Sequence, residues 1–293
     1  MNGLPPDLSA GLFQAACRAE LAAPKPGNVH VHADGHGMTV ADFVASAAAA
    51  APGLVAPDTR VGERVRAAVA ATRAACGQNT NLGILLLCAP LAAAAETGPT
   101  LRPSLAGVLA GLDRHDAALA YEAIRLASPG GLGRSDRHDV ADEPVVTLLE
   151  AMREAAGRDR IAAQYAHGYA DVFDLGVARL ASSRRAGWAD PWPMVACFLG
   201  FLAAFPDSHV ERKHGPAVAA EVRAEGALLD RMLQTADRPE AVLAALLAAD
   251  RGFKRRGINP GTSADLAVAS HYASALDTAL TSRSSSSHSI FQS

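Results

Sequence analysis

A continuous apolar stretch over residues 82–95, LGILLLCAPLAAAA, most constrains the fold of this chain. At about 14 residues it falls short of the roughly 20 that a membrane-spanning helix needs, so it predicts a buried core helix. The other apolar residues point the same way, because Ala and Leu, which favour helices, dominate them and aromatic residues make up only 5% of the chain. The sequence therefore predicts an all-α fold.

Helical periodicity continues along most of the chain, interrupted by short polar or glycine- and proline-containing breaks. Proline is expected to end several helices, as at Pro52, while Thr39 and Asp113 are placed to cap the starts of others. No alternation with period two, internal repeat or Ser/Gly-rich linker divides the sequence. We expect a single compact multi-helix domain over residues 1–280 and a disordered, low-complexity tail over residues 281–293.

The charge and cysteine content exclude several classes of partner. A formal net charge of −3 at pH 7 gives no reason to expect nucleic acid or an anionic membrane surface. The four cysteines lack CxxC spacing and fit buried thiols in a reducing compartment, and the N-terminus lacks the regions of a signal peptide. We expect a cytoplasmic protein that does not enter a membrane; its oligomeric state stays open, with a homodimer as one assembly.

Short polar clusters lie at breaks between the predicted helices, where backbone N–H groups and side chains are free for ligands. The first is PKPGNVHVHADGHG, residues 24–37, in which Lys25, Asn28 and His30 supply polar groups. A rigid surface loop is the structural alternative, although three histidines and a lysine exceed what a connector needs. Zinc is disfavoured, because the segment has no thiolate and no fixed helical spacing of its histidines.

The second cluster, GQNTNLG, opens the apolar helix. The amides of Asn79 and Asn81 can cap this helix, which is the structural explanation. Alternatively, the two amides bind a phosphate or ribose group beside the positive end of the helix. The sequence leaves both possibilities open.

A glycine-rich turn, PGGLGRSDRHDV, joins Arg134, Asp136 and Asp139 within residues 129–140. It is not a Walker A loop, because no GK[ST] follows, and it is not a dinucleotide fingerprint, because no strand precedes it. A charged, solvated loop is the simplest interpretation. Its glycines and mixed charges also suit a Mg²⁺–phosphate site, with Asp136 or Asp139 near the metal.

The cluster SHVERKHG, residues 208–215, gathers cationic and titratable groups on one predicted helical turn. His209 and Lys213 share a face if the segment is helical, with Arg212 beside them. Such groups repel one another unless an anion lies between them, and a phosphate chain is the natural partner. We favour a binding role over a solvated face.

The cluster GINPGTSADL, residues 257–266, is a turn that leads into a helix. Helix initiation alone explains its Thr and Ser residues. Asn259 and Asp265 remain candidates for contacts to a ribose or a metal ion.

Four of these clusters, in this order, resemble the motifs of the triphosphoribosyl-dephospho-CoA synthase family of the citrate lyase and malonate decarboxylase systems. PKPGNVH is similar to its PKPG-V-D/H element, GQNTNLG to G-NT-KG, SHVERKHG to SH--RKHG and GINPGTSADL to NPGTSADL. The similarity covers residues 20–280, most of the chain. It implies an all-α transferase that uses ATP with Mg²⁺, displaces adenine, and transfers the 5-triphosphoribosyl group to the ribose 2′-hydroxyl of 3′-dephospho-CoA.

The resemblance also implies roles for particular residues, since glycosyl transfer needs phosphate contacts, a metal or base, and a proton shuttle. The candidates for gripping phosphates are Lys25, Arg212 and Lys213. The candidates for the base are Asp136, Asp139 and Asp265, of which Asp136 and Asp139 are the proposed Mg²⁺ ligands. The candidates for proton transfer are His30, His209 and His214. The remaining substrate contacts are assigned to Asn28, Asn79, Asn81, Arg134 and Asn259.

Two departures from the family pattern suggest a divergent branch. Where citrate-type enzymes read NTHKG this chain has Asn81 and Leu82, and His30 stands in place of an acidic residue. The loss of a cation beside the phosphates keeps a second hypothesis open, in which the acceptor is a pterin- or furan-type precursor of a C1-carrier cofactor. A non-catalytic nucleotide-binding protein is a third hypothesis, which the adjacent Asp and His groups disfavour.

Overall fold

The computed structural model describes residues 3–129 and 137–290, with side chains as far as Ser284. Over that part of the chain it contains fourteen α-helices, one π-helix and one 3₁₀-helix, and no strand. The prediction of an all-α fold in a single domain is therefore confirmed.

The helices follow one another through short connections, except for the longer ones between α1 and α2 and between α6 and α7. In chain order they are α1 (Pro6–Ala22), α2 (Val40–Leu54), α3 (Val61–Cys76), α4 (Leu82–Thr97), α5 (Leu101–Ala110), α6 (Arg114–Ala127), α7 (Leu148–Ala155), α8 (Arg160–Ala166), the π-helix (Val172–Val177), α9 (Ala178–Arg185), α10 (Trp192–Ala204), α11 (Ser208–His214), α12 (Pro216–Thr235), the 3₁₀-helix (Pro239–Val242), α13 (Leu243–Arg255) and α14 (Gly261–Ile290).

Helix α4 is the core helix that the apolar stretch predicts, and nearly all its residues from Leu82 to Ala95 are buried. Pro90 lies inside this helix and has no N–H, so the carbonyl of Leu86, one turn earlier, lacks its usual partner. The Tyr165 hydroxyl donates to that carbonyl at 2.6 Å. The gap in the helical hydrogen-bond ladder is thus closed inside the core, where water could not reach it.

The predicted helix starts at Thr39 and Asp113 are both confirmed, because each side chain accepts a hydrogen bond from the first turn of its helix. The predicted stop at Pro52 is wrong, since α2 continues through this proline. Pro52 deprives the carbonyl of Ala48 of its partner, but Ala48 is exposed. Solvent can therefore replace the missing bond and the helix tolerates the proline.

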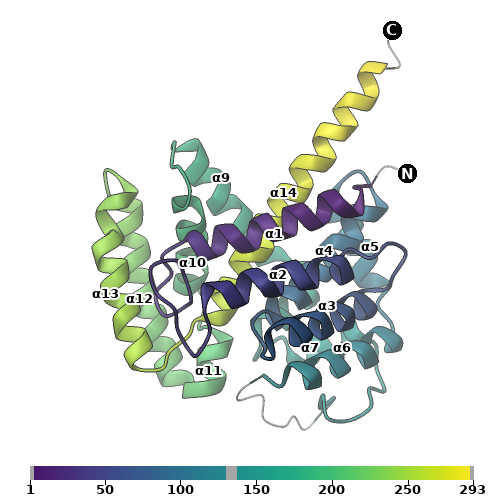
Figure 1. The fold of residues 1–293 in the computed structure, drawn as a ribbon, viewed down its shortest axis with the longest axis horizontal. Helices are drawn as coiled ribbons and strands as arrows, with labels where there is room; N and C mark the ends of the chain where they lie inside the picture. Colours follow the sequence, from purple (N-terminus) through teal and green to yellow (C-terminus); the bar gives the residue numbers. More distant parts are fainter. Residues whose placement is uncertain (1–2, 130–136, 291–293) are drawn as a thin grey trace.

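Figure 1 shows α14 running through the middle of the molecule, with α2 to α7 on one side and α9 to α13 on the other. Helix α14 packs against α1, α4, α10 and the π-helix, and its first turns lie beside α11. Its C-terminal part projects from the body of the protein (Figure 1). The NPGTSAD segment is thus placed where the two groups of helices meet.

Helix α14 extends past residue 280, where the sequence predicted a disordered tail, and reaches Ile290. The hydroxyl groups of Thr281 and Ser284 are accommodated in this helix, where each donates to the carbonyl one turn earlier. The disorder expected of the tail in solution stays a prediction. Among the described residues no single helix is long and apolar enough to cross a membrane, although two bent pairs, α4 with α5 and α10 with α11, meet that test when joined.

Candidate functional site

A cavity of about 720 Å³ lies at the start of α4 and is enclosed by α6, α7, α8, α11 and the first turns of α14. Its volume is in the range of small-molecule sites. The predicted site residues on its wall are Asn28, Asn79, Asn81, Asp139, His209, Arg212, Asn259 and Asp265. Segments far apart in the sequence therefore meet at one cavity, which is the candidate active site.

Asp207, which the sequence analysis missed, holds two of these segments together. Its Oδ1 accepts the N–H groups of His209 at 3.0 Å and Val210 at 3.1 Å, at the start of α11. Its Oδ2 accepts the N–H and the hydroxyl of Ser263, both at 2.8 Å, in the first turn of α14. One carboxylate thus satisfies the first turns of two helices and fixes His209 relative to α14. An Asp directly before SHVERKHG is an N-cap signal that could have revealed half of this arrangement.

Asp265 projects from α14 against the start of α4. A Cβ atom at Gly83 would lie 2.0 Å from its Oδ2 atom, so only glycine leaves room for the carboxyl group there. No residue in the described ranges forms a hydrogen bond with the Asp265 side chain. Burial raises its pKa well above the ordinary value, and the negative charges of Asp207 and Glu20 add to this effect. The structure thus favours the protonated form of Asp265.

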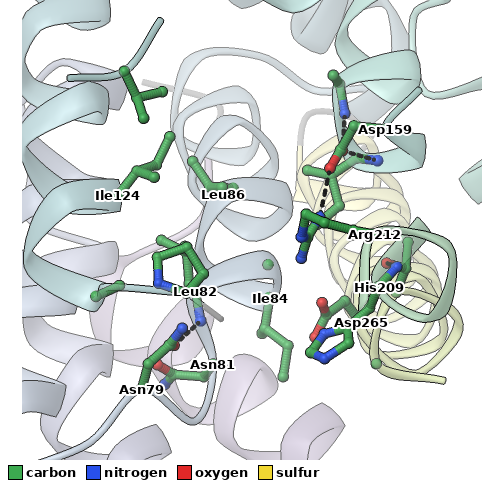
Figure 2. A pocket seen from close by; sticks show the side chains of 18 of the residues that line it. Asn79, Asn81, Leu82, Ile84, Leu86, Ile124, Asp159, His209, Arg212 and Asp265 are labelled. Carbon is green, nitrogen blue, oxygen red and sulfur yellow. Dashed lines mark hydrogen bonds and ion pairs between the residues drawn. The ribbon is translucent and has the colours of Figure 1, made fainter. Parts of the chain in front are cut away.

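His209 lies beside Asp265 on the same wall (Figure 2). Its Nδ1 atom would lie 3.1 Å from a Cβ at Gly261, so this glycine accommodates the imidazole ring. Burial, together with the nearby cationic groups of Arg212 and Lys213, lowers the pKa of His209 to about 4. His209 is therefore neutral at pH 7, while its acidic neighbour favours the protonated state.

Arg212 lies on the same wall, about one helical turn after His209. Its guanidinium Nη1 donates to Asp159 at 3.4 Å (Figure 2). Its buried Nε finds no hydrogen-bond partner among the described residues. Lys213, predicted to share the face of His209, is instead exposed and does not line the cavity. Helical spacing alone does not choose between the two cations, because residues three and four positions after His209 both lie near its face. The packing of α11 decides it, since Arg212 lines the cavity and Lys213 is exposed.

The amide side chains around the cavity divide into satisfied and unsatisfied groups. Asn79 accepts the N–H of Leu82 at 3.1 Å, so capping, the structural explanation, holds for this residue. Asn28 donates to Asn259 at 2.9 Å. The buried Oδ1 of Asn28 and Nδ2 of Asn81 have no partner within the described part of the chain. Because an unpaired buried polar atom is costly, both amides are suited to a ligand.

Lys25 does not face the cavity, which corrects its assignment as a phosphate contact. Its side chain is 0% exposed, and it donates to the carbonyls of Glu20 at 2.6 Å, Val29 at 2.9 Å and Ala23 at 3.4 Å. It also pairs with the Glu20 carboxylate at 3.0 Å, while Glu20 lines the cavity. Lys25 therefore closes the end of α1 and holds a buried carboxylate from behind, with no donor left for a phosphate.

The two other histidines proposed for proton transfer also lie outside the cavity wall. His30 is buried, with Nε2 3.4 Å from the Asp250 carboxylate and Nδ1 accepting the N–H of His32. His214 lies within hydrogen-bond distance of the Gly257 carbonyl, at 3.2 Å. Both assignments are therefore corrected, because His30 joins its loop to α13, His214 joins α11 to the loop before α14, and neither ring lines the cavity.

The proposed Mg²⁺ ligands are only partly described. Asp139 lines the cavity and accepts the N–H of Ala141 at 2.8 Å. Asp136 and Arg134 lie outside the described residues. Within residues 3–129 and 137–290 there is no group of three or more His, Cys, Asp or Glu side chains that could hold a metal ion.

The family model for ATP:dephospho-CoA triphosphoribosyl transferases (CitG) matches residues 6–284. The chain belongs to this family. A crystal structure from Archaeoglobus fulgidus, described as a candidate triphosphoribosyl-dephospho-CoA synthase, is similar with a TM-score of 0.61 and 25% sequence identity. The likeness covers 79% of this chain and 97% of that chain. Among curated proteins the comparison found no match.

The family assignment confirms the resemblance that the four clusters carry, and it makes the chain a transferase rather than a nucleotide-binding protein without chemistry. Members of the family transfer the triphosphoribosyl group of ATP to dephospho-CoA. The triphosphoribosyl transferase described here therefore has two large substrates to place in and around one cavity.

Proposed function

We propose that the transfer takes place in the polar half of the cavity, formed by Asn28, Asn81, His209, Arg212, Asn259 and Asp265. The acceptor is the ribose 2′-hydroxyl of 3′-dephospho-CoA, and adenine leaves. The observation that carries this proposal is the pairing of Asp265 and His209 on one wall, because their environments push the two pKa values in opposite directions. Such a pair is the signature of an acid and a base in one site.

The reaction breaks the bond between C1 of the ATP ribose and N9 of adenine, and forms a bond between C1 and the acceptor oxygen. The electron pair of the broken bond leaves with adenine, which must gain a proton. The acceptor hydroxyl must lose a proton as its oxygen attacks. Positive charge develops on the ribose ring between these events, as in other glycosyl transfers.

Asp265 fits the acid and His209 fits the base. A carboxyl group held protonated by burial can give its proton to the departing base, as in glycoside hydrolysis. A neutral imidazole can take the proton of the acceptor hydroxyl. After the transfer Asp265 is ionised and His209 is protonated, and proton exchange with solvent restores the starting state of both.

Arg212 and the unsatisfied amides would position the donor. The free Nε–H of Arg212 and its remaining guanidinium donors suit phosphate oxygens. The unpaired Oδ1 of Asn28 and Nδ2 of Asn81 can bond ribose hydroxyls or the edge of adenine. These contacts hold C1 of the ribose close to both Asp265 and His209.

Charge on the cavity wall favours Mg²⁺ as a companion of ATP. Apart from the protonated Asp265, the described lining carries four arginines and four acidic side chains, namely Arg73, Arg137, Arg158 and Arg212, and Glu20, Asp139, Asp159 and Glu211. The wall is thus not strongly basic, and the triphosphate needs further compensation. The Asp139 carboxylate together with phosphate oxygens would hold Mg²⁺, which is usually bound through one or two carboxylates and substrate phosphates.

A C1-cofactor precursor remains the second candidate for the acceptor. Asn81 and Leu82, which stand where citrate-type enzymes have His and Lys, both line the cavity. The departure therefore changes the site itself and not a distant surface. Replacing a cation by Leu82 suits a less charged group at that point of the wall.

The test incubates the purified chain with ATP and Mg²⁺, with and without 3′-dephospho-CoA, and quantifies free adenine by chromatography. We expect adenine only when dephospho-CoA is present, in equal amount to a product whose mass has increased by the triphosphoribosyl group. Adenine without dephospho-CoA would indicate transfer to water. No adenine, despite an ATP-induced rise in Tm, would reject dephospho-CoA as the acceptor.

A further inference from the structure

The cavity has an apolar half, formed by Leu86, Ile124, Leu148, Ala151, Met152 and Ala155. These side chains come from α4, α6 and α7. In Figure 2, Leu86 and Ile124 lie on the side opposite Asp265 and His209, with Ile84 between them. One substrate group must therefore be apolar enough to cover this surface.

Helix α7 is built to present such a surface. Leu148, Ala151 and Met152 lie on its buried face, whereas Glu150 and Arg153 point outward. The helices that pack most closely against α7 are α6 and α8, its neighbours in the chain. Its apolar face is thus used mainly to wall the cavity, and the flexible side chain of Met152 suits a ligand with several conformations.

The apolar half cannot recognise a purine edge. Its side chains are aliphatic, apart from the thioether of Met152, and carry no strong hydrogen-bonding group. The carbonyl of Leu86, freed by Pro90, is already taken by the Tyr165 hydroxyl. Unpaired donors and acceptors lie instead in the polar half, at Asn28 and Asn81. Adenine is therefore better served there than against α7.

We propose that the apolar half binds the pantetheine arm of the acceptor, a flexible and largely aliphatic chain, while the donor nucleotide occupies the polar half. This assignment rests on the proposed function, because it takes dephospho-CoA as the acceptor. His138, which also lines the cavity, can bond an amide group of the arm. A flat, rigid pterin would leave much of the aliphatic surface uncovered.

Ala155→Leu tests the proposal by filling the apolar half. Ala155 is only partly buried, so the added carbon atoms enter the cavity without overpacking the core. We expect the KM for dephospho-CoA to rise about tenfold or more, with the KM for ATP within about twofold of wild type. Ala156→Leu, at the neighbouring position outside the cavity wall, is the matched control and should change neither constant.

The pattern of KM values shows whether the pantetheine arm or the donor nucleotide occupies the apolar half. A rise in the KM for ATP alone would place the donor in the apolar half and overturn the proposal, as would unchanged constants. A binding measurement separates this result from failure of the proposed function. If no adenine forms with any acceptor, the proposed function is wrong. The assignment of the arm can still be tested by binding, because dephospho-CoA should raise the Tm of wild type and not that of Ala155→Leu. Equal shifts in both proteins would overturn the assignment of the arm.

Discussion

Lys25, in the loop that follows α1, and Asp265, in the first turns of α14, both read as site residues in the sequence, yet they have opposite roles in the structure. In the loop, Lys25 is fully buried and every donor of its ammonium group is used. At the helix starts, Asp265 faces the cavity without a hydrogen bond from the described residues. Polar content alone did not distinguish the two regions.

The difference lies in whether the polar groups are satisfied within the protein. A buried charge whose hydrogen bonds are complete stabilises one conformation and is poorly suited to a ligand. A titratable group whose environment disfavours its charged form has a shifted pKa, which is what a catalytic acid or base needs. The two regions are connected, because Lys25 pairs with Glu20, whose charge contributes to the raised pKa of Asp265.

Asp265→Asn should separate activity from stability most strongly. Loss of the proton donor should lower kcat for adenine release about 10³-fold. The pKa of Asp265 is higher in the folded than in the unfolded chain. The unfolded chain therefore ionises first, near the ordinary Asp pKa of about 4, and the free energy of unfolding falls as the pH rises above that value. The variant should therefore unfold at a higher denaturant concentration than wild type at pH 8. Near-normal kcat, or lower stability, would assign Asp265 to the scaffold instead.

Lys25→Met should show the opposite pattern. Removing one partner of a buried ion pair leaves Glu20 uncompensated, which typically costs about 3–5 kcal/mol. Denaturant unfolding should show this loss, while ATP affinity of the folded protein changes little. The double variant Glu20→Gln/Lys25→Met is the control and should recover part of the stability. Unchanged stability with weakened ATP binding would return Lys25 to the phosphate site.

Gly83→Ala tests the contact that positions Asp265. The new methyl group would collide with the carboxyl group, and a displacement of about 1 Å can lower the rate about 100-fold. Gly252→Ala in α13 is the control, because a Cβ at that position meets open space. Equal kcat values for both variants would show that the placement of Asp265 against α4 is not needed.

Arg212→Ala and Lys213→Ala compare two neighbouring cations of α11. Arg212 lines the cavity and has an unpaired Nε, so its loss should raise the KM for ATP roughly tenfold. Lys213 is exposed, so its loss should change this KM less than about twofold. Steady-state kinetics at varied ATP concentration measures both. The reverse order would restore the sequence-based assignment of Lys213.

Much of the fold could be predicted from the sequence because its signals are local. The core helix α4 follows from its apolar run, and the caps at Thr39 and Asp113 follow from residue type and position. The exception at Pro52 depends on the exposure of Ala48, which no local pattern reveals. Local rules therefore give the helices more reliably than their ends.

The site was predictable only as a set of segments. The order of the clusters identified the family, and eight of the assigned residues line the cavity. The direction of each side chain depends on tertiary packing, so Lys25 and Lys213 were placed wrongly. Asp207 and the apolar surface of α7 were missed, because an N-cap and an amphipathic helix look the same with or without a ligand.

The pH dependence of adenine release tests the central claim, that Asp265 acts as a protonated acid and His209 as a neutral base. The rate should fall at low pH as His209 gains a proton, near its pKa of about 4 and below the ordinary range of histidine. It should fall again as the pH rises through the raised pKa of Asp265. In Asp265→Asn the alkaline decrease should disappear. An alkaline decrease that is the same in wild type and variant would contradict this account.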